Sequence, residues 1–267
     1  MQQTLERAPD WPPAWFALGE AREKLDDKPG AAQAFRAALA ADPTDALGAA
    51  PRLAVLGEGS PARGLPRAYV ARLFDDYAAR FDRHLVGDLA YRAPQLIDAA
   101  LEASAPNRRF ARALDLGCGT GLAGAPLRAR VDRLDGVDLS PAMLAKARER
   151  NLYDALDVAD LVDHLRRFPA AFNLIVAADA LVYCGDLAPV FAAAAAALAP
   201  GGLFAFTVET YAGDGYRLGA TMRFAHARAY VEATAAAAGM TLRRVEEASS
   251  RCEAGAAVAG LVCVFLT

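Results

Sequence analysis

The segment Asp115-Leu116-Gly117-Cys118-Gly119-Thr120-Gly121 limits the possible folds of this chain more than any other feature. It follows the apolar run 111–116, which predicts a buried strand, and it precedes a helical stretch. Glycines allow the sharp turn between the two and let a ligand lie against bare backbone, while free N–H groups at a helix N-terminus attract an anionic group. A second apolar run ends in Asp138, about 20 residues after the first glycine, where a parallel α/β sheet places a carboxylate on ribose hydroxyls. The pattern predicts a nucleotide-type cradle.

The spacing of the glycines distinguishes between cofactors. A dinucleotide loop has the pattern G-x-G-x-x-G, and its third glycine would fall here on Leu122. No lysine of a phosphate-binding loop follows either. Nicotinamide chemistry, and with it a dehydrogenase, is therefore the weakest of the enzyme hypotheses.

The loop DLGCGTG, together with GVDLSPAML at 136–144, is similar to the first two motifs of class I S-adenosylmethionine-dependent methyltransferases. Later segments agree in order with the family's fourth strand, the hinge and strand that follow, and the strand pair that closes its sheet: 172–179, Pro200-Gly201-Gly202 with 203–209, 242–249 and 256–266. The resemblance covers about residues 69–267. It implies an α/β, Rossmann-like fold with a seven-stranded, mostly parallel sheet flanked by helices.

The resemblance also implies S-adenosyl-L-methionine as cofactor and S-adenosyl-L-homocysteine as product. The residues it assigns to the cofactor are Asp115, Gly117, Cys118, Gly119, Gly121, Asp138, Leu139, Met143, Asp160, Leu161 and Asp179. Asp115 would lie near the ammonium group, Asp138 would accept the ribose hydroxyls, and Asp179 would face the reacting methyl. Met143 would lie on the adenine face, although it suits a helix core equally well. Asp160 is expected to end a strand 156–160 and to accept the adenine amino group, with three nearby aspartates as competitors.

Residues 69–101 place apolar and aromatic side chains at helical spacing and predict two or more helices. These helices are expected to fold over the cofactor as a lid. Tyr77 is the catalytic candidate there and Tyr91 an acceptor contact, whereas Phe74 and Phe81 are expected to pack the helix onto the sheet.

A second group of acceptor-side candidates follows the strand 203–209. Glu209, a catalytic candidate, ends that strand, and Arg217, a candidate for contact with the acceptor, follows a glycine-rich loop. Arg223, His226 and Tyr230 have i, i+3, i+7 spacing and would share one face of a predicted helix. On that hypothesis His226 is a general base and Arg223 an anion anchor, and the alternative is a structural helix face. Arg251 and Glu253, which both precede the last strand, are further candidates for the acceptor pocket.

The N-terminal part is predicted to be a small all-α unit. Residues 15–43 resemble one tetratricopeptide unit through Trp15, Leu18, Gly19, Ala31, Phe35, Ala38 and Pro43. Residues 28–30 are expected to turn the chain between its two helices, and Pro51 is expected to interrupt a third. The domains would then be a TPR-like helical segment 1–56, a linker 57–66 and a methyltransferase domain 67–267. The segment would bind a partner peptide in a groove, or it would be a hairpin packed on the main domain or the stub of a longer array. So few repeats offer little concave surface, which favours the last two.

The net charge and one short motif limit the class of acceptor molecule. With 29 basic and 32 acidic residues the net charge is −3, which argues against binding of long nucleic acid. Asp179-Ala180-Leu181-Val182-Tyr183 stands where amino-directed DNA and protein-glutamine enzymes carry [DN]PP[YF]. A small-molecule O or N acceptor is therefore preferred. The alternatives are a protein methyltransferase that recruits its target through the TPR-like segment, and a non-catalytic cofactor-binding module.

Cysteine usage and hydropathy bear on the compartment. The four cysteines form no CxxC pair, and with three histidines they predict neither a metal site nor a disulfide framework. The first ten residues are too polar for a signal peptide, and the most apolar run, 256–266, is too short to cross a membrane. These features favour a cytoplasmic protein without a membrane partner.

Overall fold

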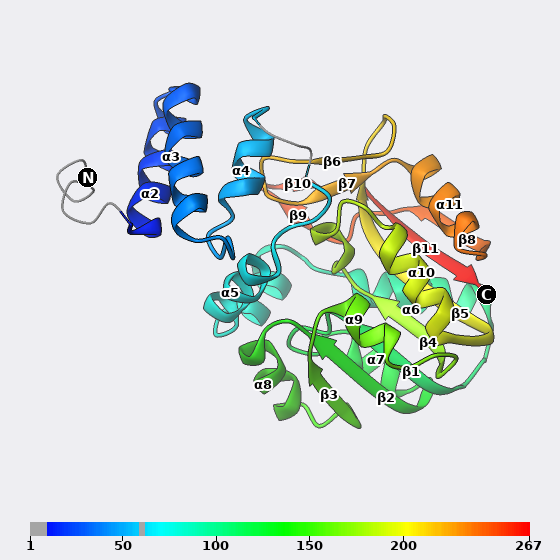
Figure 1. The fold of residues 1–267 in the computed structure, drawn as a ribbon. Helices are drawn as coiled ribbons and strands as arrows, with labels where there is room; N and C mark the ends of the chain where they lie inside the picture. Colours follow the sequence, from blue (N-terminus) through cyan, green and yellow to red (C-terminus); the bar gives the residue numbers. More distant parts are fainter. Residues whose placement is uncertain (1–9, 59–61) are drawn as a thin grey trace.

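The structure, a computed structural model, describes residues 10–58 and 62–267 (Figure 1). Its centre is a twisted sheet in the order β3-β2-β1-β4-β5-β11-β8, and β11 runs antiparallel to both of its neighbours. The strands are β1 (Phe110–Leu116), β2 (Val131–Asp138), β3 (Ala155–Val158), β4 (Phe172–Ala177), β5 (Leu198–Thr210), β8 (Thr241–Glu247) and β11 (Gly260–Leu266). The predicted mostly parallel, Rossmann-like sheet is confirmed. Two short strands, β6 (Tyr216–Leu218) and β7 (Phe224–His226), extend it at the carboxyl end of β5, and β9 (Cys252–Glu253) and β10 (Ala256–Ala257) form a separate pair.

Helices cover both faces of the sheet because its central strands are apolar on both sides. Along β5, Phe204 and Phe206 point to the face covered by α9 (Leu161–Arg166), α10 (Ala188–Ala197) and α11 (Arg228–Ala237). Leu203 and Ala205 alternate with them and point to the face covered by α6 (Ala93–Ser104) and α7 (Gly124–Arg128). The resulting two-sided core positions the carboxyl ends of the strands.

The end of β2 leads into α8 (Pro141–Glu149) as the sequence predicts. Ser140 is the N-cap, its Oγ accepts the N–H of Met143 at 3.0 Å, and proline is the first helical residue. The end of β3 differs from the prediction, because the strand stops at Val158. Asp160 lies beyond it as the N-cap of α9, where its Oδ1 accepts the N–H groups of Val162 and Asp163.

A segment that we call the lid, residues 67–92, crosses the carboxyl ends of β1 and β2. It consists of α5 (Arg67–Tyr77) and a π-helical stretch, η1 (Arg83–Asp88). Asp75 accepts hydrogen bonds from Ser140 Oγ and the Ala142 N–H, which ties α5 to the start of α8. Asp82 accepts from Thr120 Oγ1 and Arg150 Nη2 and ties the lid to the glycine loop.

Three helices precede the lid: α2 (Pro12–Lys24), α3 (Lys28–Ala41) and α4 (Ala49–Val55). A Cβ on Gly19 would lie 2.5 Å from Cε1 of Phe35, so glycine allows α2 and α3 to pack closely. Two predictions were wrong. The chain turns at residues 25–27 and not at 28–30, which open α3, and Pro51 lies in the first turn of α4, where proline removes no intrahelical hydrogen bond.

Part of the predicted linker, 57–66, packs on the main domain, and residues 59–61 lie outside the described residues. The N–H of Leu65 donates to the carbonyl of Tyr183 at 3.0 Å, and the carbonyl of Arg63 accepts the N–H groups of Gly185 and Asp186. Among the helices of residues 10–58 and 62–267, none has the length and apolar character that a membrane span requires.

Candidate functional site

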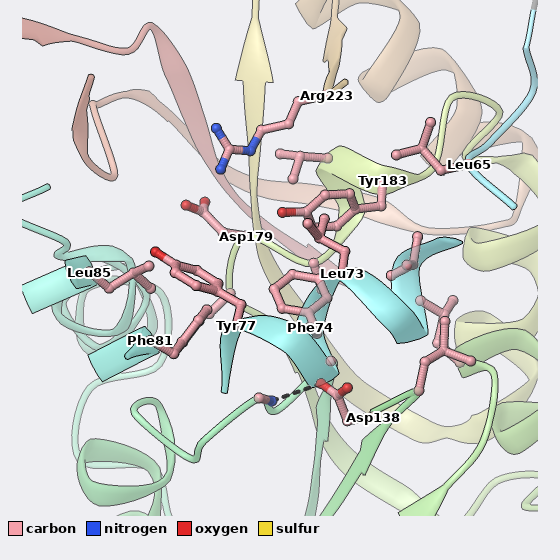
Figure 2. Close-up of a pocket in the computed structure, with 18 of the residues that line it drawn as sticks. Leu65, Leu73, Phe74, Tyr77, Phe81, Leu85, Asp138, Asp179, Tyr183 and Arg223 are labelled. Carbon is pink, nitrogen blue, oxygen red and sulfur yellow. Dashed lines mark hydrogen bonds between the residues drawn. The ribbon is translucent and has the colours of Figure 1, made fainter. Parts of the chain in front are cut away.

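A cavity of about 700 Å³ lies between the lid and the carboxyl ends of β1, β2 and β4 (Figure 2). Strand β1 is paired with β2 on one side and β4 on the other, so the cavity opens where the strand order reverses. This is where open α/β sheets bind their ligands. Figure 2 shows Asp138 and Arg223 at opposite ends of the cavity, with Phe74, Tyr77 and Tyr183 between them.

The glycine bend after β1 forms one wall with its main chain. Gly117 has φ +65°, and a Cβ there would lie 2.6 Å from Cβ of Ala180. Gly119 has φ +54° and donates its N–H to Oδ2 of Asp138 at 2.9 Å. Gly121 packs against Tyr153, and neither it nor Cys118 lines the cavity. Glycine is thus required at 117 for space as well as for conformation, and at 119 for conformation.

Asp138 lines the cavity at the end of β2. Its Oδ1 accepts the N–H of Ser140 at 2.8 Å, and its Oδ2 faces Gly119. Burial raises the pKa of Asp138, and the N–H groups at its two oxygens oppose that rise. Leu139 lines the wall beside it. A bare-backbone bend, a fixed carboxylate and an adjacent apolar wall fit the sugar and base of an adenosyl cofactor.

Replacing Asp138 with alanine should weaken S-adenosylhomocysteine binding by about 1–3 kcal/mol, because charge-assisted hydrogen bonds to the ribose are lost. Isothermal titration calorimetry measures the effect, and a thermal melt checks that the variant folds. Asp132→Ala, at the exposed amino end of the same strand, is the matched control and should bind normally. An unchanged dissociation constant for Asp138→Ala would remove this residue from the site.

The structure separates the other residues assigned to the cofactor into two groups. Asp160 and Leu161 line the cavity, and Asp160 also forms an ion pair with Arg67 of the lid at 3.0 Å. Met143 is completely buried in the core and does not line the cavity, which favours the helix-core alternative.

Asp115 also lies outside the cavity lining. Only 1% of its surface is exposed, Tyr153 donates to its Oδ2 at 2.7 Å, and its Oδ1 has no hydrogen-bond partner in the described part of the chain. Burial raises the pKa of Asp115 to about 7. The carboxyl is therefore buried against Tyr153 outside the cavity, and its raised pKa favours the protonated form.

A network of ion pairs surrounds Asp179 at the other end of the cavity. Asp179 accepts hydrogen bonds from Thr207 Oγ1 at 2.7 Å, Ser250 Oγ at 2.8 Å and Arg251 Nη1 at 3.0 Å. The Arg251 side chain is 4% exposed and also donates to Glu209 and Glu253. Glu209 is thus paired with arginine and does not line the cavity, whereas Asp179, Arg251 and Glu253 do.

The prediction that Arg223, His226 and Tyr230 share one helix was wrong. Residues 224–226 are strand β7, held by pairing with β5 and β6, and Tyr230 lies on α11. His226 is completely buried outside the cavity lining, and its Nε2 lies within hydrogen-bond distance of the carbonyl oxygens of Cys184 and Gly185. Burial lowers its pKa to about 4. Arg223 does line the cavity and pairs with Glu253, whereas Arg217 stacks on the ring of Tyr211 away from it.

The lid contributes the aromatic wall. Tyr77 and Tyr91 line the cavity as expected, but so do Phe74 and Phe81, for which packing onto the sheet was the preferred interpretation. Phe74 packs edge-on against Tyr183, a lining residue that the sequence did not single out. His84 was also missed, although it lies seven residues after Tyr77, a spacing that places both on one side of a helical lid.

The chain is similar to known methyltransferases. Residues 113–202 match the family model described as "Methyltransferase domain". Methyltransferase-like protein 27 of Homo sapiens is 40% identical over 103 residues, which are 38% of this chain and 42% of that protein. The malonyl-[acyl-carrier protein] O-methyltransferase of Enterobacter lignolyticus is 34% identical over 138 residues, 52% of each chain. The chain thus spans about half the length of these relatives.

Solved structures agree on the fold. The 1,6-didemethyltoxoflavin-N1-methyltransferase of Burkholderia thailandensis, solved with its substrate and S-adenosylhomocysteine, has a TM-score of 0.60 and 20% identity over 78% of this chain and 92% of its own. The [4+2]-cyclase SpnF has a TM-score of 0.63 and is 18% identical, and the match covers 79% of this chain and 99% of the cyclase chain. The molecule therefore has the Rossmann-like fold of methyltransferases, a fold that also serves another reaction.

Proposed function

We propose that this protein is an S-adenosylmethionine-dependent methyltransferase that methylates an oxygen or nitrogen of a small molecule. The methyltransferase domain match at 113–202 and the S-adenosylhomocysteine bound in a structural neighbour support the reaction and the cofactor. Relatives named for malonyl-[acyl-carrier protein] and for ubiquinone biosynthesis, and a neighbour named for a toxoflavin precursor, support a small acceptor group.

The observation that carries the proposal is a single cavity with two chemically different ends. Gly117, Gly119, Asp138 and Leu139 would hold the cofactor, which supplies a methyl group already activated on a sulfonium. The aromatic lid would exclude water, and its ring faces suit a cation. The acceptor would lie at the Arg223 end, where the chain orients it for in-line transfer.

We also infer that α2 and α3 are a tetratricopeptide-like hairpin that supports the lid. The close contact of Gly19 with Phe35 supports this relationship. Downstream, Val55 at the end of α4 packs against a cluster that contains Leu65, Val70 and Phe224, and Gly48 contacts Tyr69 of α5. These contacts join the N-terminal helices to the base of the lid, which favours a structural role over capture of a protein target.

A tritiated-methyl transfer assay against a cell extract tests the function. The extract is separated by ultrafiltration into small-molecule and protein pools, and the labelled species is identified by mass spectrometry. We expect label in the small-molecule pool, whereas label confined to proteins would favour a protein methyltransferase. Binding of S-adenosylhomocysteine without transfer to either pool would indicate a non-catalytic module. NADH titrated in parallel should show no binding.

A further inference from the structure

One histidine lies in the acceptor part of the cavity. His84 belongs to the π-helical stretch η1 of the lid and lines the cavity. π-helical turns are rare in proteins, and those that occur are frequently found at functional sites. Its Nδ1 contacts the phenolic oxygen of Tyr77, and the two rings meet edge-on with centroids 5.6 Å apart. Among the described residues, Nε2 forms no hydrogen bond or ion pair, so this nitrogen is the one available to a ligand.

We propose that His84 is the general base that removes a proton from the acceptor, and that Tyr77 holds its imidazole in place. This inference rests on the proposed function. It also narrows the acceptor to a group with a proton to lose, such as an alcohol, a phenol or a neutral N–H. A carboxylate would need no such base.

The other ionisable groups are less suited to the role. His164 is 3% exposed and His226 is 0% exposed, and neither lines the cavity. Asp179 and Glu253 are both held by Arg251. Burial raises the pKa of Tyr77 and, to a greater extent, that of Tyr91, so both phenols stay protonated at neutral pH. The imidazole of His84 offers a free nitrogen to the cavity and can take a proton without first breaking an ion pair.

The acceptor's O–H or N–H proton passes to Nε2 of His84 while a lone pair on the same acceptor atom forms the new bond to the methyl carbon. The carbon–sulfur bond breaks and its electron pair stays on sulfur, which leaves a neutral thioether. The imidazolium then returns its proton to solvent. Tyr77 Oη accepts from the Nδ1–H throughout and keeps Nε2 directed at the acceptor.

The charges that face the imidazole come from several elements. Tyr77 and Arg80 lie on the α5 side, and Asp88 ends η1. Arg223, Arg251 and Glu253 line the opposite wall. Asp179 also lies on that wall, and the ion pairs of Glu253 with both arginines and of Asp179 with Arg251 balance the two positive charges.

The experiment compares wild type with His84→Gln and Tyr77→Phe, using the small-molecule pool of an extract as the acceptor. Transfer rates are measured from about pH 5.5 to 8.5. We expect His84→Gln to lose on the order of 10²-fold in rate at neutral pH and to lose the rise in rate with pH that wild type shows. S-adenosylhomocysteine affinity should change little. Arg83→Gln, the exposed neighbour outside the cavity lining, is the matched control and should keep the wild-type rate.

A second readout does not depend on transfer. Diethyl pyrocarbonate modifies accessible neutral imidazoles, so peptide mass spectrometry should find His84 as the principal labelled histidine, and the label should be absent from His84→Gln. If wild type and His84→Gln are equally active, or if His84 stays unlabelled in the folded protein, the assignment of His84 as general base is overturned and the proposed function stands. A wild type that binds S-adenosylhomocysteine but transfers no methyl would overturn the proposed function and the base with it.

Discussion

Replacing Arg251 with methionine should lower the free energy of unfolding by about 3–5 kcal/mol at pH 7. The side chain is 4% exposed and bonds to Asp179, Glu209 and Glu253. Burial alone would lower the pKa of Arg251, but the carboxylates of Asp179 and Glu209 outweigh it and raise the pKa. Methionine would fill the space and leave three carboxylates close together, with Arg223 as the remaining cation beside Glu209 and Glu253.

The pH dependence separates this electrostatic cause from simple loss of packing. Arginine partners outweigh burial and lower the pKa of Glu253 in wild type, so its contribution to stability is present at neutral pH and is lost as the pH falls through that pKa. The difference between wild type and Arg251→Met in urea unfolding should therefore narrow toward pH 4. Arg228→Met breaks an exposed pair with Glu232 and should cost less than about 1 kcal/mol. A cost for Arg251→Met as small as that would mean that the network does not hold the acceptor end together.

Replacing Asp115 with asparagine should stabilise the protein by about 2–4 kcal/mol at pH 8 and hardly at all at pH 4. Burial raises the folded-state pKa of Asp115 to about 7 from 3.8. The folded protein then holds a proton that the unfolded chain has released, so stability falls as the pH rises from about 4 to about 7 and is constant above. Asparagine has nearly the same shape, keeps an oxygen for Tyr153 and carries no charge to desolvate.

Chemical denaturation at several pH values measures this prediction. Asp132→Asn removes an exposed carboxylate from the neighbouring strand and should leave the wild-type pH profile unchanged. The same pH profile for wild type and Asp115→Asn would show that the pKa of this carboxyl does not differ between the folded and the unfolded protein.

The features predicted well from the sequence are those whose physical requirement is local. Gly117 and Gly119 have positive φ, and a side chain at 117 would collide with Ala180, so the glycine pattern reports a backbone that few other residues adopt. Ser140 with a following proline marks the start of α8 for a similarly local reason. The periodicity of the strands reports a buried sheet because each strand must be apolar on its own.

The features predicted poorly depend on what a segment packs against. The i, i+3, i+7 pattern of Arg223, His226 and Tyr230 suggested a helix, but pairing with β5 makes 224–226 a strand and buries His226. The local sequence hardly distinguishes Asp115, outside the cavity, from Asp138, in its lining, since Asp115 is the next-to-last residue of one buried strand and Asp138 the last residue of another.

The sequence by itself determined the α/β class, the glycine bend and the carboxylate at the end of β2, because backbone conformation and strand periodicity depend on residues that are neighbours in the sequence. Only the tertiary structure decided which polar groups meet in the acceptor part of the cavity. His84, Asp179, Arg223 and Arg251 come from four separate segments, and the packing of the lid over the sheet places His84 in the same cavity as the other three. Their roles depend on burial and on the charges nearby, which no short stretch of sequence specifies.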